Sequence, residues 1–66
     1  MKLIINGKTK EYQESLTVQQ LLQKLNLSPD RVVVELNRQI LSPDIHVKTQ
    51  LKSGDTVELV QFVGGG

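Results

Sequence analysis

Residues 2–13 read KLIINGKTKEYQ, and they decide the fold because they predict a β-hairpin at the start of the chain. Asn6-Gly7 is the strongest short-range hairpin signal, since a type I′ turn needs positive φ at both central residues. The returning strand, residues 8–13, is polar and rich in lysine, which suits an exposed sheet edge.

A helix is predicted directly after this hairpin. Thr17 and Gln20 fit a T-x-x-Q capping box, in which each side chain accepts a hydrogen bond from the other residue's backbone. We expect a helix of about ten residues, from Ser15 or Thr17 to near Asn26, because apolar residues recur at i, i+3, i+4 and i+7. These residues are Val18, Leu21, Leu22 and Leu25.

Strands are predicted for most of the remaining chain. Proline disfavours helical backbone in the residue before it, so Ser28-Pro29-Asp30 separates the helix from the next strand. The run VVVEL at residues 32–36 is β-branched and predicts a strand. The further predictions are a turn at Asn37-Arg38, a short strand at 39–41, a loop with a helical turn at 42–50, a turn at 53–55 and a final strand at 56–63.

This order of elements predicts an α+β fold. A helix that crosses one face of a small sheet buries one layer against another. At this length we expect a ubiquitin-like β-grasp: a mixed sheet of about four to five strands, with one main helix packed on one face. Residues 1–63 would form this domain, with the final strand beside the first, and residues 64–66 a flexible glycine tail.

Composition excludes several classes of protein. The 66 residues make one small domain, and 8 basic against 7 acidic residues are interspersed, without the basic stripe of a nucleic-acid-binding protein. The absence of cysteine excludes disulfides and thiolate metal sites and fits a reducing compartment. Because no signal peptide or transmembrane pattern is present, we expect a cytoplasmic protein that contacts no membrane. We also expect the free protein to be a monomer.

Strand alternation assigns side chains to the two faces of the predicted sheet. Charged Glu58 indicates that its face of the final strand is solvated, so the alternate residues point towards the helix. The expected inward residues are Leu3, Ile5, Val32, Val34, Leu36, Val57 and Leu59. The expected outward apolar residues are Ile4, Val33, Val60 and Phe62. A contiguous patch of such residues often marks a partner site, and the alternative is that they are singly exposed apolar residues, which need no explanation.

No catalytic constellation is evident inside the predicted domain. His46 is the only histidine, and a lone histidine is far more often a surface or packing residue than a metal ligand. The serines lie at predicted caps and turns, no carboxylates pair as acid and base, and the glycines form no phosphate-binding motif. We expect no catalytic residue, no metal site and no cofactor bound by this chain.

Three glycines, Gly64, Gly65 and Gly66, follow the final strand. Glycine loses more conformational entropy on ordering than any other residue, so such a run resists packing. It can, however, enter a narrow channel and deliver a carboxylate, and three extended residues reach about 10 Å. A frayed end is the alternative. Because the chain starts at Met1 without tag sequence, we expect the glycines to be functional.

The chain resembles the ThiS family, the small sulfur carriers of thiamine biosynthesis. The similarity rests on VELVQFVGGG at residues 57–66, VVVELNRQIL at 32–41 and LKSGDTVEL at 51–59, and it covers essentially the whole length. The family's defining pair of glycines matches Gly65 and Gly66, and Gly64 is an additional glycine. Residues 42–50 carry the weakest resemblance.

The resemblance implies a carrier cycle in which this chain is a substrate and not an enzyme. A partner adenylating enzyme, of the type that activates ubiquitin, would use ATP and Mg²⁺ to convert the Gly66 carboxylate to an acyl-adenylate. A cysteine-desulfurase system would supply sulfur to form a thiocarboxylate, and thiazole synthase would accept it. Gly64 and Gly65 would provide passage into the partner.

The outward residues Ile4, Val33, Val60 and Phe62 are the hypothesised docking surface for these partners, with Glu58 and Arg38 as rim contacts. Three other functions remain open at this point. They are a carrier for molybdopterin synthase or for RNA thiolation, a covalent protein modifier joined to lysine, and a β-grasp interaction module with an inert tail.

Overall fold

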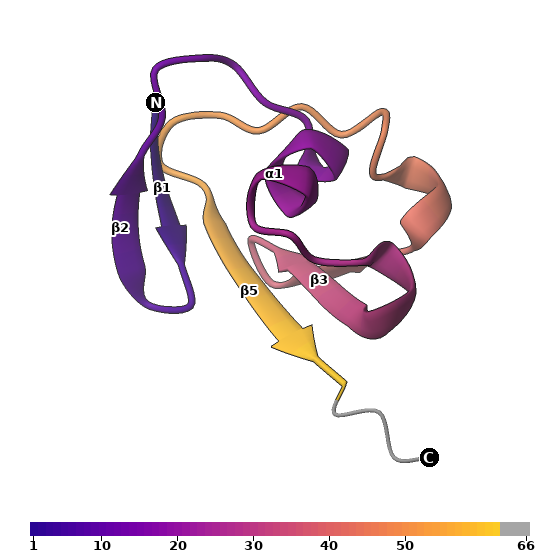
Figure 1. The fold of residues 1–66 in the computed structure, drawn as a ribbon. Helices are drawn as coiled ribbons and strands as arrows, with labels where there is room; N and C mark the ends of the chain where they lie inside the picture. The colour runs from indigo at the N-terminus through magenta and orange to yellow at the C-terminus, as the bar shows by residue number, and fades with distance from the viewer. Residues whose placement is uncertain (63–66) are drawn as a thin grey trace.

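The computed structural model describes residues 1–62 (Figure 1). The strands are β1 (Lys2–Ile5), β2 (Lys8–Glu11), β3 (Val32–Leu36), β4 (Gln39–Leu41) and β5 (Thr56–Gln61). One α-helix, α1 (Val18–Lys24), and two 3₁₀ turns, η1 (Pro29–Arg31) and η2 (Pro43–Ile45), complete the secondary structure of this part. Val63 and the predicted tail, Gly64, Gly65 and Gly66, lie outside the described residues.

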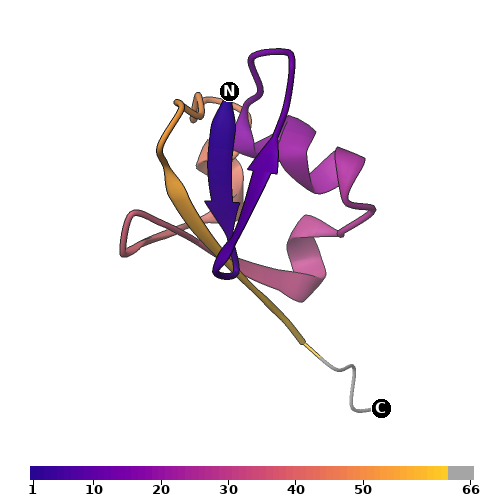
Figure 2. The same cartoon turned by 90° about the vertical axis from the view of Figure 1, so that its left-hand side faces the viewer.

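The sheet confirms the predicted β-grasp topology. Its five strands follow the order β2-β1-β5-β3-β4, so the final strand lies in the centre. β5 is parallel to β1 and antiparallel to β3. Helix α1 covers one face of this sheet, while the opposite face carries no helix of the described chain (Figure 2).

The hairpin forms as the Asn-Gly signal predicts. Asn6 and Gly7 adopt φ of 50° and 80°, the positive values that a type I′ turn requires. β2 is an edge strand whose four residues are all exposed. It ends at Glu11, two residues before the predicted end of the returning strand.

Helix α1 begins as predicted but is shorter. The capping box of Thr17 and Gln20 is present, with hydrogen bonds of 2.9 and 3.2 Å. The helix has seven residues because Asn26 takes a φ of 57°, the left-handed conformation that ends many helices. Asn26 N–H then donates to the Gln23 carbonyl, and Leu27 N–H to the Leu22 carbonyl, which is the Schellman pattern.

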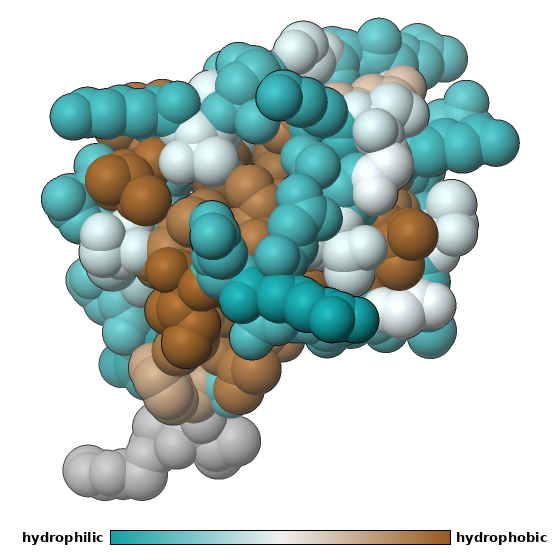
Figure 3. All heavy atoms as spheres, turned by 180° about the vertical axis from the view of Figure 1, so that it is seen from behind, coloured by the Kyte–Doolittle hydropathy of each residue, from teal (hydrophilic) through white to brown (hydrophobic). Residues whose placement is uncertain are grey.

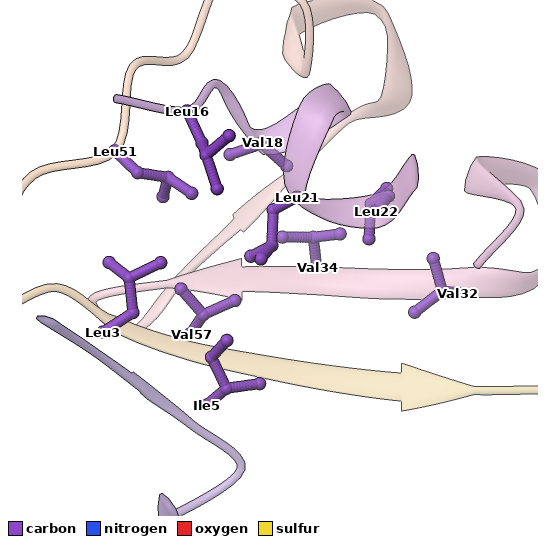
Figure 4. Close-up of a cluster of buried hydrophobic side chains, with 10 residues drawn as sticks. All are labelled: Leu3, Ile5, Leu16, Val18, Leu21, Leu22, Val32, Val34, Leu51 and Val57. Atoms are coloured by element: carbon purple, nitrogen blue, oxygen red, sulfur yellow. The ribbon is translucent and has the colours of Figure 1, made fainter. Parts of the chain in front are cut away.

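The core lies between α1 and the covered face of the sheet (Figure 4). Most residues predicted to point inward are buried, whereas Leu25, Leu36 and Leu59 are only partly buried at its border. The core also contains Leu16 and Leu51, from segments outside the helix and strands. A 2.8 Å hydrogen bond from Leu51 N–H to the Leu16 carbonyl holds these two segments together.

In the part of the chain that the structure describes, no helix is long and apolar enough to span a bilayer.

Leu21 is fully buried, so its truncation should strongly destabilise this small domain. We expect Leu21→Ala to lower the free energy of unfolding by about 2–5 kcal/mol, because it removes apolar burial and leaves a cavity. Val47→Ala is the control, since Val47 is more than half exposed and its truncation should change stability by less than about 0.5 kcal/mol. Urea unfolding of both variants measures the difference, and equal effects would contradict this packing.

Candidate functional site: the final strand and its two flanks

β5 is the element that leads towards the predicted reactive end of the chain. It pairs with β3 over five residue pairs, from Leu36↔Val57 to Val32↔Gln61. Its pairing with β1 covers only Ile4↔Thr56 and Ile5↔Val57. The second half of β5 is therefore supported mainly from the β3 side.

Asn6 supplies the missing support on the β1 side. Leu59 N–H donates to Asn6 Oδ1 at 2.7 Å, and Asn6 Nδ2 donates to the Leu59 carbonyl at 3.3 Å. A side-chain amide therefore takes the place of a paired strand residue. The sequence pattern predicts only the turn at Asn6. The one feature of the sequence that could have indicated this second role is that the residue at this turn has an amide side chain, which can both donate and accept hydrogen bonds.

Asn37 supports the start of β5 in a similar way. Thr56 N–H donates to Asn37 Oδ1 at 2.9 Å, and Asn37 Nδ2 donates to Asp55 Oδ1 at 3.0 Å. Both Asn6 and Asn37 have positive φ in turns, where this residue type is tolerated. Each turn therefore contributes both a change of chain direction and a fixed contact to the central strand.

The described part of the chain ends in a hydrogen bond to η1. Phe62 N–H donates to the Arg31 carbonyl at 2.8 Å, immediately after β5. This contact fixes the direction of the chain at the end of β5. Arg31 is itself exposed at this end of the sheet, and no sequence pattern predicted its contact with the final strand.

Three of the predicted docking residues gather on the open face near that end. Val33 and Val60 are direct cross-strand partners, and Phe62 follows Val60 by two residues, immediately after β5. Val60 and Phe62 expose 59% and 54% of their surface, and Val33 is half-buried. Figure 3 shows this face, with apolar atoms concentrated towards its lower end. We refer to Val33, Val60 and Phe62 as the apolar patch.

Ile4, also predicted for the docking surface, lies apart from this patch. Ile4 is 36% exposed, as an outward residue should be, but its register partner on β5 is Thr56. Glu58 lies between Thr56 and Val60 on the same face of β5, so a charged side chain interrupts the apolar surface. The reason is the parallel register, which places Ile4 at the start of β5 and not at its end.

Of the two predicted rim residues, only Glu58 borders the patch. It lies one step along the face from Val60 and pairs directly with Glu35 of β3. Arg38 lies in the β3–β4 turn, beside the start of β5, because Asn37 N–H donates to the Thr56 carbonyl at 2.8 Å. The two facing carboxylates repel each other, since like charges directly opposite on a sheet are destabilising.

His46 is a packing residue in this structure. It is 3% exposed, and neither ring nitrogen has a hydrogen-bond partner in the described chain. Nowhere in residues 1–62 do three or more histidine, cysteine, aspartate or glutamate residues gather as metal ligands would. His46 therefore belongs to no such cluster in this part of the chain.

The fold and the family pattern agree with known proteins. The model of the ThiS family matches residues 3–66. The chain belongs to the ThiS family. It is 35% identical over 65 residues to the sulfur carrier protein ThiS of Bacillus subtilis. This match covers 97% of this chain and 98% of that protein.

A solved ThiS structure and longer relatives extend this similarity. The crystal structure of the thiamine biosynthesis protein ThiS from Geobacter metallireducens matches with a TM-score of 0.85 and 40% identity over 100% of both chains. The thiazole synthase of Paramagnetospirillum magneticum is 38% identical over 66 residues. This match covers 100% of our chain but only 20% of the synthase, so the chain spans a fifth of that relative's length.

The Asn6 contact predicts a local effect on β5. Asn6→Gly keeps a residue that tolerates positive φ but removes both hydrogen bonds to Leu59. We expect the free energy of unfolding to fall by about 1–2 kcal/mol, and amide exchange at Leu59 to accelerate more than at Leu3 in the core. Hydrogen exchange followed by NMR measures both sites. Unchanged exchange at Leu59 would show that the side chain does not hold the strand.

Proposed function

We propose that this chain is a sulfur carrier protein of thiamine biosynthesis that carries sulfur as a thiocarboxylate on Gly66. The observation that carries the proposal is the match of the ThiS family over residues 3–66, which includes all three glycines. The relative from B. subtilis that aligns over nearly its whole length is itself a sulfur carrier protein ThiS. ThiS proteins are small carriers and not enzymes, so this chain is a substrate on which enzymes act.

The chemistry requires activation before sulfur transfer. A carboxylate is a poor electrophile, so a partner enzyme with ATP and Mg²⁺ would first join Gly66 to AMP and release pyrophosphate. The terminal sulfur of a persulfide, from a cysteine-desulfurase system, would then attack the carbonyl carbon and displace AMP. A thiol that cleaves the resulting S–S bond reductively releases the thiocarboxylate. In this scheme the chain itself binds neither ATP nor Mg²⁺.

The proposed sulfur acceptor is thiazole synthase. Two thiazole synthases, from P. magneticum and Magnetococcus marinus, contain a segment that is 38% and 33% identical to this chain. A carrier segment and a synthase in one polypeptide support a working relationship between the two activities. The molybdopterin-type carrier remains the second candidate, because it would use the same activation chemistry with a different acceptor.

The apolar patch is the proposed docking surface for these enzymes. It lies on the face that no helix of the described chain covers, at the end of β5 from which the chain continues towards Gly66. Apolar area in such a position allows a partner to hold the folded domain while the glycines, Gly64 and Gly65, pass into its active site. Glu58 borders this patch and belongs to the proposed surface, whereas Ile4 and Arg38 lie at the far end of the sheet.

Mass spectrometry of the intact protein purified from cells tests the carrier proposal. We expect a fraction of the chain to be heavier by the mass difference between sulfur and oxygen. Deletion of Gly65 and Gly66 should abolish both this species and ATP-dependent adenylation, while leaving the unfolding transition unchanged. Persistence of adenylation in the deletion variant would contradict the proposal, and a lysine-linked adduct would favour a protein modifier.

Substitution within the apolar patch tests the docking surface separately. We expect the double variant Val60→Ser/Phe62→Ser to weaken binding to the adenylating enzyme about tenfold or more, because exposed apolar anchors carry much of the energy of an interface. Ile40→Ser is the matched control, since Ile40 is a highly exposed apolar residue on the edge strand β4. Calorimetric titration measures affinity and urea unfolding measures stability. Lost stability with unchanged affinity would exclude this surface.

A further inference from the structure

A second surface flanks β5 on the side of the sheet that faces the helix. It is a groove of about 380 Å³ between the β1–β2 hairpin, the end of α1 and the second half of β5. Three half-buried leucines, Leu25, Leu27 and Leu59, line it together with two lysines, Lys8 and Lys10. The groove is separate from the apolar patch, because Leu59 and Val60 point to opposite faces of β5.

The lysines point towards the groove because of the hairpin register. Lys8 pairs with Ile5 and Lys10 pairs with Leu3, and both partners are buried on the helix side of the sheet. Directly paired residues share a face, so both lysine side chains leave β2 on that side. No acidic residue lines the groove, and the single ion pair in residues 1–62 joins Lys24 and Glu14 elsewhere. The groove therefore carries two positive charges without carboxylate partners in the described chain.

Beyond Leu59, the edge of β5 at the same place pairs with no described strand. The Asp55 carbonyl accepts a hydrogen bond from Ile4 N–H of β1, and the Val57 carbonyl accepts one from Asn6 N–H. The Leu59 backbone bonds to the Asn6 side chain. Every second residue from Asp55 to Leu59 therefore directs its backbone groups to this side. Gln61 is the next residue in this alternation and lines the groove. β1 ends at Ile5, so no described strand lies beside Gln61 on this side (Figure 1).

We propose that this groove binds an extended acidic segment of a partner protein, which pairs with β5 at Gln61, beyond the Asn6–Leu59 contact, and places its carboxylates against Lys8 and Lys10. Strand addition supplies main-chain hydrogen bonds, and side chains at alternate positions supply specificity. Apolar side chains on the same segment would cover the three leucines.

Charge disfavours the β2 edge of a second copy of this chain as the occupant. Lysines on an edge strand repel the same edge of another copy, which is a common protection against self-association. The same lysines attract an acidic strand, and this charge complementarity selects the partner. The groove therefore favours an acidic strand over a lysine-bearing one.

The test uses the ¹⁵N-labelled full chain and two end-blocked synthetic peptides, one alternating glutamate with valine and one alternating lysine with valine. At low salt we expect the acidic peptide to shift the amide resonances of residues 8–10, 25–27 and 59–61, and the basic peptide to shift none of them. The double variant Lys8→Gln/Lys10→Gln should weaken the acidic peptide about tenfold. Lys48→Gln/Lys52→Gln, outside the groove, is the control for net charge and should bind normally.

Two further probes separate strand addition from simple charge attraction. An acidic peptide with N-methyl groups on alternate amides cannot pair with β5, so it should bind several-fold more weakly. The proposal would be overturned if this peptide bound equally well or if inorganic phosphate caused the same shifts. It would also be overturned if the shifts were confined to the open face, or if they appeared without peptide and depended on protein concentration. No adenylating enzyme takes part, so failure here leaves the carrier proposal untouched.

Discussion

The central position of β5 is the constraint on which the rest of this structure depends. A parallel strand beside β1 cannot follow directly from the hairpin, so the intervening chain must cross the sheet, and α1 provides this crossover and buries one face. Once β5 lies between β1 and β3, the core has its two layers, and no helix of residues 1–62 covers the opposite face. The same placement directs the end of the strand away from the body of the domain.

Local signals made much of the fold predictable from the sequence. The Asn6-Gly7 turn, the capping box of Thr17 and the run at Val32–Leu36 depend on neighbouring residues alone, and each forms where it is predicted. The early end of α1 was missed because the left-handed conformation of Asn26 depends on the Schellman bonds around it. Leu16 and Leu51 were missed because they have no periodicity, and tertiary contact alone brings their two segments into the core.

The candidate site was less predictable because it depends on register between strands that are distant in sequence. Strand alternation correctly placed Ile4 and Val60 on one face, but alternation contains no information about how far two strands are shifted along each other. The structure sets that shift through the packing of Ile5 and Val57 under the helix, and it leaves Ile4 beside Thr56. The face to which a side chain points can therefore be predicted from one strand alone. Which side chains lie next to one another on that face depends on the register of several strands.

The charges on the two flanks of β5 are of opposite sign, and this difference bears on how the domain would meet the partners proposed for it. Glu35 and Glu58 lie beside the apolar patch on the open face, while Lys8 and Lys10 line the groove on the helix side. A partner whose contact surface is basic is attracted to the open face and repelled by the groove, and the reverse holds for an acidic segment. Specificity arises from such repulsion as well as from attraction. Under the proposed carrier function, two enzymes that act on Gly66 would approach the end of β5 from different sides, and each would have to release the domain before the other binds.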